Sequence, residues 1–578
     1  MPDPPKERWS SRIGVIMAVA GSSVGLGNFL RFPGLAAQYG GGAFMLAYVI
    51  SFLLLGLPCG WMEWAMGRAA GLRGFNSGPA AFGILGRHPL AKFAGVIAIV
   101  VPVVIFFYYI AIEGWCLGYA WNFLWQSLPI HDAADAKAYF DRFTGNAGDG
   151  SAIMFSVHSA LPWLALVFVL NFWLIYRGLC GGIELACNWG MPALILLALV
   201  VLARVLTLGS PDSARPNDSV KNGLGFMWNP AKVVLEKQEQ GRWKEERSLV
   251  GPAMIDEAKS SIAGDLTRRV REVPVMEQLA KPDLWLAAAG QIFFSLGVGF
   301  GILLVYASYL GKKDDLVLSG LTASAANEFC EVALGGLITI PAGVAFLGVA
   351  GVAGQGTFEL GFKVLPLVFQ RMPLGWLFGS LFFFMLFLAA LTSSIAMIQP
   401  GIAFFEEALR IGRKASVGLL AAICTLGAGF VAWFSGNGLK ALDTLDFWIG
   451  TCLIFILATM QTIIFGWVWG TENGWKALHE GAALRLPRWF IPVFRWIAPT
   501  FLLTIFAFWL LINVFGVSFS GAPAEWSSYV KDLFEKPNAV AWLSLGLAAA
   551  LTVLLVLIVK RSPTYKHLQK LDREGSRS

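Results

Sequence analysis

The chain has 578 residues, of which only 14% are charged (44 Lys and Arg, 37 Asp and Glu), whereas a typical soluble protein has about 25%. Hydrophobic residues make up 56%, so the polar surface needed to cover several water-soluble cores is missing, and a soluble enzyme, a disordered chain and a fibrous protein are excluded. The net charge of +7 comes from short clusters between apolar runs, which indicates a membrane and no nucleic-acid partner.

Apolar stretches long enough to cross a bilayer recur along the whole chain. Such a helix needs about 20 predominantly apolar residues. We count twelve stretches, at 13–30, 43–62, 93–112, 160–176, 186–203, 284–311, 332–356, 374–405, 416–436, 447–470, 496–521 and 539–559. The sequence therefore predicts an all-α polytopic membrane protein with twelve transmembrane helices.

The loop charges predict how the chain lies in the membrane. An even number of spans places both termini on one side, and Met1–Ser11 has no signal-peptide cleavage pattern. The loops on the side of the termini carry about twice as many Lys and Arg as the short loops opposite. We therefore expect a multi-pass protein of the cell (inner) membrane with both termini in the cytoplasm.

One connection, 209–282 between the fifth and sixth spans, is long and charged. By parity it is extracellular or periplasmic, and it contains helix-like segments such as Met254–Glu272. It is either a small folded cap or a solvated amphipathic excursion, and we favour the excursion.

Cysteine and histidine give no sign of catalysis or of a metal cluster. The seven cysteines lie within or beside apolar runs without paired spacing, and we interpret them as small hydrophobic residues. The five histidines are scattered over loops and ends. No nucleophile–base pair stands out, so we predict that the protein is not an enzyme.

Two apolar spans share a glycine-interrupted pattern. Ser23-Val24-Gly25-Leu26-Gly27 in the first span is echoed by Ser295-Leu296-Gly297-Val298-Gly299 in the sixth, and an odd repeat of five spans inverts the topology. Glycine inside a helix costs about 1 kcal/mol relative to alanine, so we predict that both helices break there. The freed backbone N–H and carbonyl groups must line a cavity or bind a ligand. An amino acid zwitterion together with a cation would provide partners for both kinds of group. The alternative is close helix packing through small residues.

Several motifs carry a family resemblance. Gly21–Pro33 with Arg8-Trp9, and the segments Gly40–Phe44, Glu63–Arg68, Tyr108-Tyr109, Gln291–Leu296, Asn327-Glu328, Leu391–Ser394 and Asp446–Trp448, closely resemble the neurotransmitter:sodium symporter family, with the bacterial leucine-transporter type nearest. The matches follow one another in order through all ten helices of the family's core.

The resemblance implies sodium-driven symport by alternating access. It also implies an inverted repeat of spans 1–5 and 6–10 with broken helices 1 and 6, followed by two peripheral spans. The expected organisation is a cytoplasmic segment 1–11, a first repeat 12–208, an insertion 209–282, a second repeat 283–471, peripheral spans 472–561 and a cytoplasmic tail 562–578. A homodimer is possible.

Two sodium sites are implied by the same resemblance. The first comprises Ser23, Asn28, Ser295 and Asn327 with the substrate carboxylate, and the second comprises Gly21, Val24, Ala389, Thr392 and Ser393. Sodium is a hard cation, and amide, hydroxyl and freed carbonyl oxygens are the ligands that such a bundle offers. Taken singly, the asparagines could equally form interhelical hydrogen bonds, and Thr392-Ser393 could bond to the preceding helical turn.

The substrate site is likewise implied. The N–H groups near Leu26 and Gly27 with the Tyr109 hydroxyl would bind a carboxylate, and carbonyls around Ser23 and Phe294 would bind an ammonium group. The pocket would comprise Ser23, Gly25, Leu26, Gly27, Ile105, Tyr109, Phe294, Ser295, Gly297, Phe300, Ser393 and Met397. Monoamine-transporting relatives have aspartate at position 25, so Gly25 favours a full amino acid. Gly297 replaces a serine of the leucine type, which suggests a larger hydrophobic or aromatic substrate.

Charged pairs resembling gates are expected at both ends of this site. Arg31 would pair with Asp446 above Phe300 and Tyr109, because an intramembrane charge needs a partner. On the cytoplasmic side Lys6 and Glu407 would pair beneath Trp9, although these two could also be ordinary interfacial charges.

Glu331 leads to the expectation of chloride independence. Chloride-dependent relatives have a small neutral residue at this position, whereas Glu331 lies one helical turn from Asn327 and could supply the negative charge itself. Its alternative role is that of an interfacial charge. A different function on the same fold, amino-acid sensing or ion conduction without coupled transport, also stays open.

Overall fold

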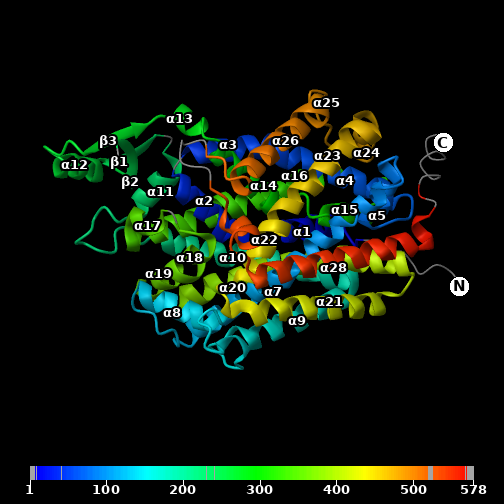
Figure 1. Ribbon diagram of the computed structural model, residues 1–578, viewed down its shortest axis with the longest axis horizontal. Helices are drawn as coiled ribbons and strands as arrows, with labels where there is room; N and C mark the ends of the chain where they lie inside the picture. Colours follow the sequence, from blue (N-terminus) through cyan, green and yellow to red (C-terminus); the bar gives the residue numbers. More distant parts are fainter. Residues whose placement is uncertain are drawn as a thin grey trace.

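The computed structural model describes residues 7, 9–40, 42–229, 231–239, 241–353, 355–518, 525–566 and 568. This part of the chain forms a long bundle of helices with a small sheet at one end (Figure 1). The first and sixth predicted spans are broken: α1 (Arg12–Ser23) continues into η1 (Gly27–Arg31) and α2 (Phe32–Tyr39) with a bend of 49°, and α14 (Pro282–Leu296) continues into α15 (Ile302–Ser308).

Nine further helices in the described residues are long and apolar enough to span a membrane, or ten if the bent first pair counts as one. With π-helical and 3-10 turns labelled η, they are α3–η2–α4 (Gly42–Ser51, Phe52–Gly56, Leu57–Gly71), α6–α7 (Ala91–Ala94, Ile97–Leu124), η4–α10 (Leu179–Glu184, Leu185–Leu206), α16–η5–α17 (Leu316–Glu328, Phe329–Gly336, Leu337–Val352), α20 (Gly375–Leu409), α21–η7 (Arg413–Trp433, Phe434–Gly436), α22–η8–α23–η9–α24 (Lys440–Phe447, Trp448–Leu453, Ile454–Ile463, Ile464–Gly470, Thr471–His479), α25–η10–α26–η11 (Phe490–Pro492, Val493–Ile497, Ala498–Trp509, Leu510–Val514) and α28 (Ala539–Arg561).

The predicted fourth span is the shorter helix α9 (Ala160–Tyr176). Each predicted span thus contains helix within the described residues, while the exact count of twelve stays a prediction. The connections hold α5 (Gly78–Leu85), α8 (Ala133–Thr144), η3 (Ser151–Ile153), α18 (Thr357–Glu359), η6 (Leu360–Val364), α19 (Leu365–Arg371), α27 (Ser528–Phe534) and η12 (Pro563–Tyr565).

The insertion 209–282 is a folded cap, so the prediction that we favoured, a solvated amphipathic excursion of the chain, was wrong. It contains α11 (Val220–Trp228), β1 (Lys232–Glu239), β2 (Arg242–Leu249), α12 (Pro252–Ser261), β3 (Arg268–Val273) and α13 (Val275–Leu279). The strands form an antiparallel sheet in the order β2-β1-β3, the exception to the all-α prediction, and Leu235, Leu249 and Ala258 form a small core between sheet and α12. The helix expected over Met254–Glu272 ends at Ser261, because Arg268–Val273 form β3 and pair with β1 instead.

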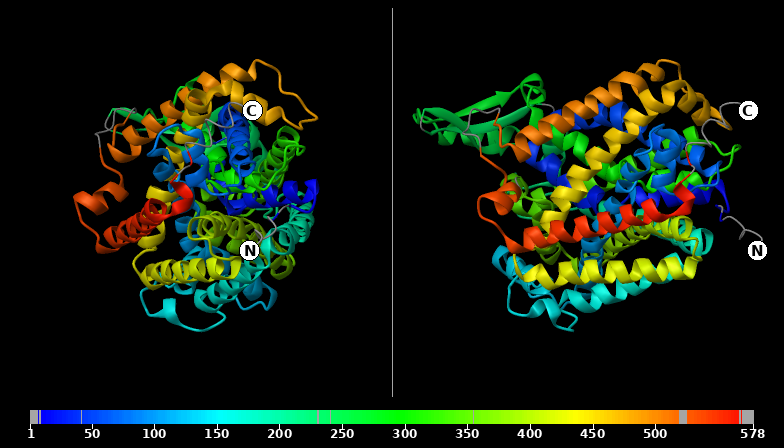
Figure 2. Two further views of the ribbon diagram at one scale, coloured as in Figure 1. Left: turned by 90° about the vertical axis from the view of Figure 1, so that its right-hand side faces the viewer. Right: turned by 45° about the vertical axis from the view of Figure 1, so that its right-hand side comes forward.

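The centre of the bundle is formed by α7 and α20, which pack along each other and are buried over 94% and 83% of their most apolar stretches. By contrast, α10, α26 and α28 are buried over only 28%, which leaves their apolar outer faces suited to lipid. Figure 2 shows these helices around the bundle and the sheet projecting beyond it. The two broken helices therefore lie against a rigid, buried centre.

Both described chain ends lie at the same end of the bundle. The Glu7 carboxylate pairs with Arg413 at 2.8 Å, and the Ser562 hydroxyl donates to the Ala408 carbonyl at 2.8 Å. Both partners flank the connection between α20 and α21. We call this the terminal end, and the opposite end, where the sheet projects, the insertion end (Figures 1 and 2).

Candidate functional site

The first helix break is held by side chains from its own helix and from α7. Val24 has an extended backbone (φ −72°, ψ 101°), which ends α1 and frees the following N–H groups. The Gly25 N–H donates to the Asn28 side-chain oxygen at 2.8 Å, and the Leu26 N–H donates to the Tyr109 hydroxyl at 3.3 Å. The break thus places freed backbone beside two groups that the sequence had assigned to sodium and to substrate.

The second break requires glycine. Gly297, Gly299 and Gly301 all have left-handed backbones (φ +64°, +78° and +78°), which residues with a side chain rarely adopt. The Gly299 N–H donates to the Glu63 carboxylate at 2.5 Å, and the Ser23 hydroxyl donates to the Leu296 carbonyl at 3.2 Å. The interpretation of both motifs as helix breaks is therefore correct, and Ser23 links the two.

Four polar side chains of the expected first sodium site and its surroundings meet in one buried cluster. Asn28 donates to Asn327 at 2.9 Å and to Ser295 at 3.3 Å, and Asn327 donates to Ser295 at 2.7 Å. Glu331 accepts from Asn28 at 3.1 Å and from the Ser295 hydroxyl. All four residues are at most 1% exposed, so the cluster offers several oxygens away from solvent. Ser23 is bonded to Leu296 rather than to this cluster.

The residues of the expected second sodium site also come together. The Ser393 hydroxyl lies 3.2 Å from the Gly21 carbonyl, 3.3 Å from the Val24 carbonyl and 3.1 Å from the Ala389 carbonyl. The Thr392 hydroxyl lies 3.1 Å from the carbonyls of Leu388 and Ala389 in its own helix, which is the back-bonding that the sequence left open. Carbonyls from a broken helix and hydroxyls from α20 thus converge, and oxygens of this kind suit a hard cation.

Three of the predicted pocket residues lie on the two central helices. Ile105 and Tyr109 lie on α7, Met397 lies on α20, and all three are buried. The Phe294 and Phe300 rings flank the second break with centroids 6.1 Å apart.

Three glycines define the room around these aromatic side chains. A Cβ on Gly25 would lie 2.9 Å from the hydroxyl oxygens of Ser393 and Tyr109, and one on Gly27 would lie 2.8 Å from the Phe294 ring. A Cβ on Gly297 would meet nothing within 4 Å. Space is therefore closed at the first break and open at Gly297.

The expected gate at the insertion end is not closed. Asp446 accepts from the Tyr108 hydroxyl at 2.7 Å, while the Arg31 guanidinium lies over the Phe294 ring, 4.7 Å from its centroid. Among the described residues, no carboxylate lies within 4.0 Å of the Arg31 guanidinium.

At the terminal end the first described residues bridge neighbouring elements, beside a cavity of about 770 Å³ that Trp9 and Tyr309 line. The Trp9 indole N–H donates to the Tyr306 carbonyl at 3.1 Å, and Glu7 pairs with Arg413. Lys6 lies outside the described residues. Glu407 accepts from the Asn76 N–H at 2.6 Å and from the Ser77 hydroxyl at 2.5 Å.

Some residues that organise the site had been given no role. Gln291 donates to Glu331 at 2.8 Å, and Glu63 caps the second break. Buried Glu113 accepts from Asn171 at 2.9 Å and from Ser394 at 2.6 Å, next to Ser393. A charged residue inside an apolar run is the sequence signal that could have singled out both glutamates. Gln291 carries no such signal.

Comparison with known proteins places the chain in a family. Residues 6–189 and 270–564 match the model of the sodium:neurotransmitter symporter family. The chain is 27% identical over 499 residues to an uncharacterized sodium-dependent transporter of Methanocaldococcus jannaschii, with 84% of this chain and 86% of that protein covered. It is 25% identical over 582 residues to the human sodium- and chloride-dependent taurine transporter, with 97% and 86% covered.

The solved structure of MhsT in complex with L-phenylalanine is similar, with a TM-score of 0.66 and 26% identity over 87% of this chain and 99% of that chain. The family model and the sodium-dependent relatives, together with the long apolar helices of the described residues, define a multi-pass, sodium-dependent membrane transporter rather than an enzyme. The chain belongs to the sodium:neurotransmitter symporter family, which confirms the resemblance carried by its motifs.

Proposed function

We propose that this protein is a sodium-coupled symporter of amino acids that works by alternating access. The observation that carries the proposal is the pair of helix breaks, whose freed backbone groups face buried amide and hydroxyl groups. Two sodium ions would be bound, one by the Asn28–Asn327 cluster and one by the carbonyls around Ser393. The substrate carboxylate would lie beside the first ion, so that ion and substrate bind together.

The substrate class proposed is a hydrophobic or aromatic amino acid with free carboxylate and ammonium groups. A side chain at Gly25 would have to displace two hydroxyl oxygens that lie 2.9 Å from its Cβ, which disfavours the aspartate that would pair with a monoamine. The open space at Gly297 supports a large substrate side chain. The similarity to MhsT, solved with L-phenylalanine, is in keeping with this class.

Transport is proposed to be independent of chloride because Glu331 supplies a fixed negative charge. Its carboxylate is fully buried and accepts from Gln291, Asn28 and Ser295, so an interfacial position does not describe it. The charge must be neutralised when the empty carrier returns, and we propose that Glu331 then takes up a proton. Transport would thus be sodium symport with proton antiport.

The placement in the membrane completes the proposal. Twelve spans in a cell (inner) membrane would place the terminal end in the cytoplasm and the insertion end outside. Trp9 and Glu7 would then bind their neighbours Tyr306 and Arg413 on the cytoplasmic side, and Arg31 and Asp446 would lie unpaired with each other on the outer side. A homodimer is compatible with the exposed apolar faces of the peripheral helices.

Uptake into proteoliposomes tests the proposal against a sensor or an ion channel on the same fold. Labelled L-phenylalanine should accumulate with an inward sodium gradient, and phenylalanine methyl ester and phenethylamine should compete poorly. Absence of accumulation, or equal competition by the amine, would contradict symport or the substrate class respectively.

Chloride independence has a matched pair of variants. Wild-type uptake should be equal in chloride and in gluconate, whereas Glu331→Ser should be active in chloride only. Glu359→Ser is the control, because Glu359 lies outside this cluster and pairs with Lys363. A wild type that stops in gluconate would refute the assignment of Glu331.

A further inference from the structure

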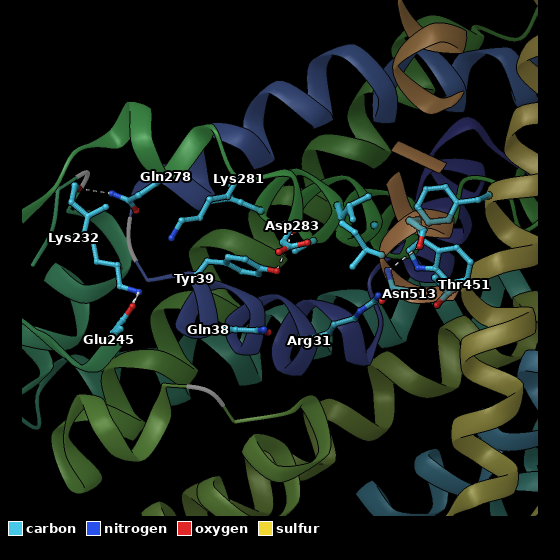
Figure 3. A pocket seen from close by; sticks show the side chains of 18 residues that line it. Arg31, Gln38, Tyr39, Lys232, Glu245, Gln278, Lys281, Asp283, Thr451 and Asn513 are labelled. Carbon is cyan, nitrogen blue, oxygen red and sulfur yellow. Dashed lines mark hydrogen bonds and ion pairs between the residues drawn. The ribbon is translucent and has the colours of Figure 1, made fainter. Parts of the chain in front are cut away.

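A buried carboxyl group, that of Glu113, connects three helices behind the expected second sodium site. It lies on α7 and contacts Asn171 of α9 and Ser394 of α20, and all three side chains are 0% exposed. None of the three lines the cavity of about 630 Å³ at the insertion end, which Figure 3 shows, so water in that cavity does not contact them. Their polar atoms therefore depend on one another for hydrogen bonds.

The distances within this cluster include more short contacts than an ionised carboxylate can explain. The Ser394 hydroxyl oxygen lies 2.6 Å from Glu113 Oε2 and 2.7 Å from Asn171 Oδ1, but a hydroxyl has only one proton to donate. The Asn171 amide donates one proton to Glu113 Oε1 and one to the Val167 carbonyl, each at 2.9 Å. Four contacts thus share three protons, which leaves one pair of oxygens in contact without a proton between them.

Turning the Asn171 amide over does not remove this shortage. Exchange of its oxygen and nitrogen would place the amide oxygen against Glu113 Oε1 and the Val167 carbonyl, which are both acceptors. A proton on Glu113 Oε2 does remove it. The acid then donates to Ser394, the Ser394 hydroxyl donates to Asn171, and Asn171 donates back to Glu113 Oε1. The bond between Glu113 and Ser394 thus runs from the acid to the hydroxyl, and every contact has its proton.

The surroundings of Glu113 also disfavour a negative charge. In the described part of the chain no Lys, Arg or His nitrogen lies within 4.0 Å of its carboxyl oxygens. An ionised carboxylate buried without a cationic partner is costly, and such a group generally becomes neutral instead. Hydrogen bonding and burial therefore both indicate a protonated carboxylic acid.

This ring of hydrogen bonds fixes the rotation of α20 at the expected second sodium site. Ser393 and Ser394 are neighbours in one helix, so their side chains point in directions about 100° apart. Ser394 contacts α7 and α9, while the Ser393 hydroxyl lies 3.2 Å from the Gly21 carbonyl at the first break. A rotation of α20 that breaks one set of contacts therefore disturbs the other.

We propose that Glu113 acts as a neutral, protonated carboxylic acid that positions Ser393 for sodium through Ser394. Glu113 contacts neither the ion nor the substrate, so it is a positioning residue. The role of Ser393 rests on the proposed function, whereas the protonated state of Glu113 does not. Because the acid is neutral, its effect on sodium binding comes from geometry and not from charge.

Infrared spectroscopy of the purified full-length protein tests the proton. A protonated carboxylic acid has a C=O stretching band at higher frequency than carboxylates and amides, and the band shifts in deuterium oxide. The spectrum of wild type minus that of Glu113→Gln should contain this band. The matched control is Glu359→Gln, which removes a carboxylate paired with Lys363 at 3.2 Å and should give carboxylate bands only. Carboxylate bands alone for Glu113→Gln would overturn the proposal, whether or not the protein transports amino acids.

Binding of ²²Na⁺ to the same purified proteins tests the positioning. Glutamine accepts from Asn171 and donates to Ser394 as the acid does, so Glu113→Gln should keep the half-saturating sodium concentration within about twofold of wild type. Aspartate is too short to reach both partners, and Ser394→Ala removes one member of the ring. Glu113→Asp and Ser394→Ala should therefore raise the half-saturating sodium concentration about 5- to 150-fold.

The amount of sodium bound at saturation should stay equal in all variants, because a positioning residue changes affinity and not the number of sites. Tight binding in Glu113→Asp with weak binding in Glu113→Gln would show that a negative charge is needed, and equal affinity in every variant would show that the ring positions nothing. Either result overturns the proposal. A wild type that binds no sodium would refute the proposed function and the role of Ser393, and the infrared result would still decide the protonation of Glu113.

Discussion

Adding a single methyl group at Gly25 should disturb sodium binding by displacing Ser393, a proposed sodium ligand. In Gly25→Ala the new Cβ would lie 2.9 Å from the hydroxyl oxygens of Ser393 and Tyr109, closer than an ordinary contact. The Ser393 oxygen must retreat, and its contacts of 3.2 Å to Gly21 and 3.3 Å to Val24 are already near the limit of a hydrogen bond. Overpacking of this kind typically costs about 1–3 kcal/mol.

If that cost falls on the ion-bound state, the sodium concentration for half-maximal uptake should rise about 5- to 150-fold. The assay is uptake of labelled L-phenylalanine against sodium concentration in proteoliposomes. The control is Gly546→Ala, because a Cβ at this position in α28 meets nothing within 4 Å. An unchanged sodium requirement in a folded Gly25→Ala protein would refute the reasoning that these hydroxyls organise the ion site.

Three other substitutions follow from the same geometry. Ser393→Ala should raise the sodium concentration for half-maximal uptake more than Thr392→Val does. The reason is that the Ser393 hydroxyl contacts the first break, whereas the Thr392 hydroxyl contacts carbonyls of its own helix. Titration of uptake with sodium in both variants checks which has the larger effect. Tyr109→Phe should raise the KM for L-phenylalanine about 10- to 150-fold, since a hydrogen bond to a charged group contributes about 1.5–3 kcal/mol, whereas Ile105→Val should change KM little. Uptake kinetics in which both variants behave alike would contradict this. Trp9→Phe removes the hydrogen bond to the Tyr306 carbonyl at the terminal end, so thiol labelling of a cysteine introduced there should be faster than in wild type, and equal rates would count against a role of this bond in holding that end together.

The sequence was most informative where residue types with a distinct chemical role recur at a regular spacing. The glycine-interrupted motifs predicted both helix breaks, because the left-handed backbones at Gly297 and Gly299 need glycine. Asn28, Ser295 and Asn327 were expected together and do form one cluster. The family itself followed from motifs spread over ten helices and is confirmed by the family model.

Long-range side-chain geometry was beyond the sequence. The cap was mistaken for an excursion because its core consists of a few residues, such as Leu235 and Ala258, that are distant in the chain. The charged sequence of β3 resembles a helix, and only its pairing with β1 shows that it is a strand. Likewise nothing in the sequence shows that Gln291 would reach Glu331, since that contact depends on how two broken or bent helices cross.

Simultaneous measurement of ²²Na⁺ and labelled L-phenylalanine entering the same proteoliposomes tests sodium-coupled symport most directly. The account predicts that each flux requires the other, that both disappear in Asn28→Leu, and that the ratio of sodium to amino acid stays fixed as the substrate concentration varies. Sodium entry at the same rate without the amino acid, or amino acid uptake that persists with choline in place of sodium, would contradict it.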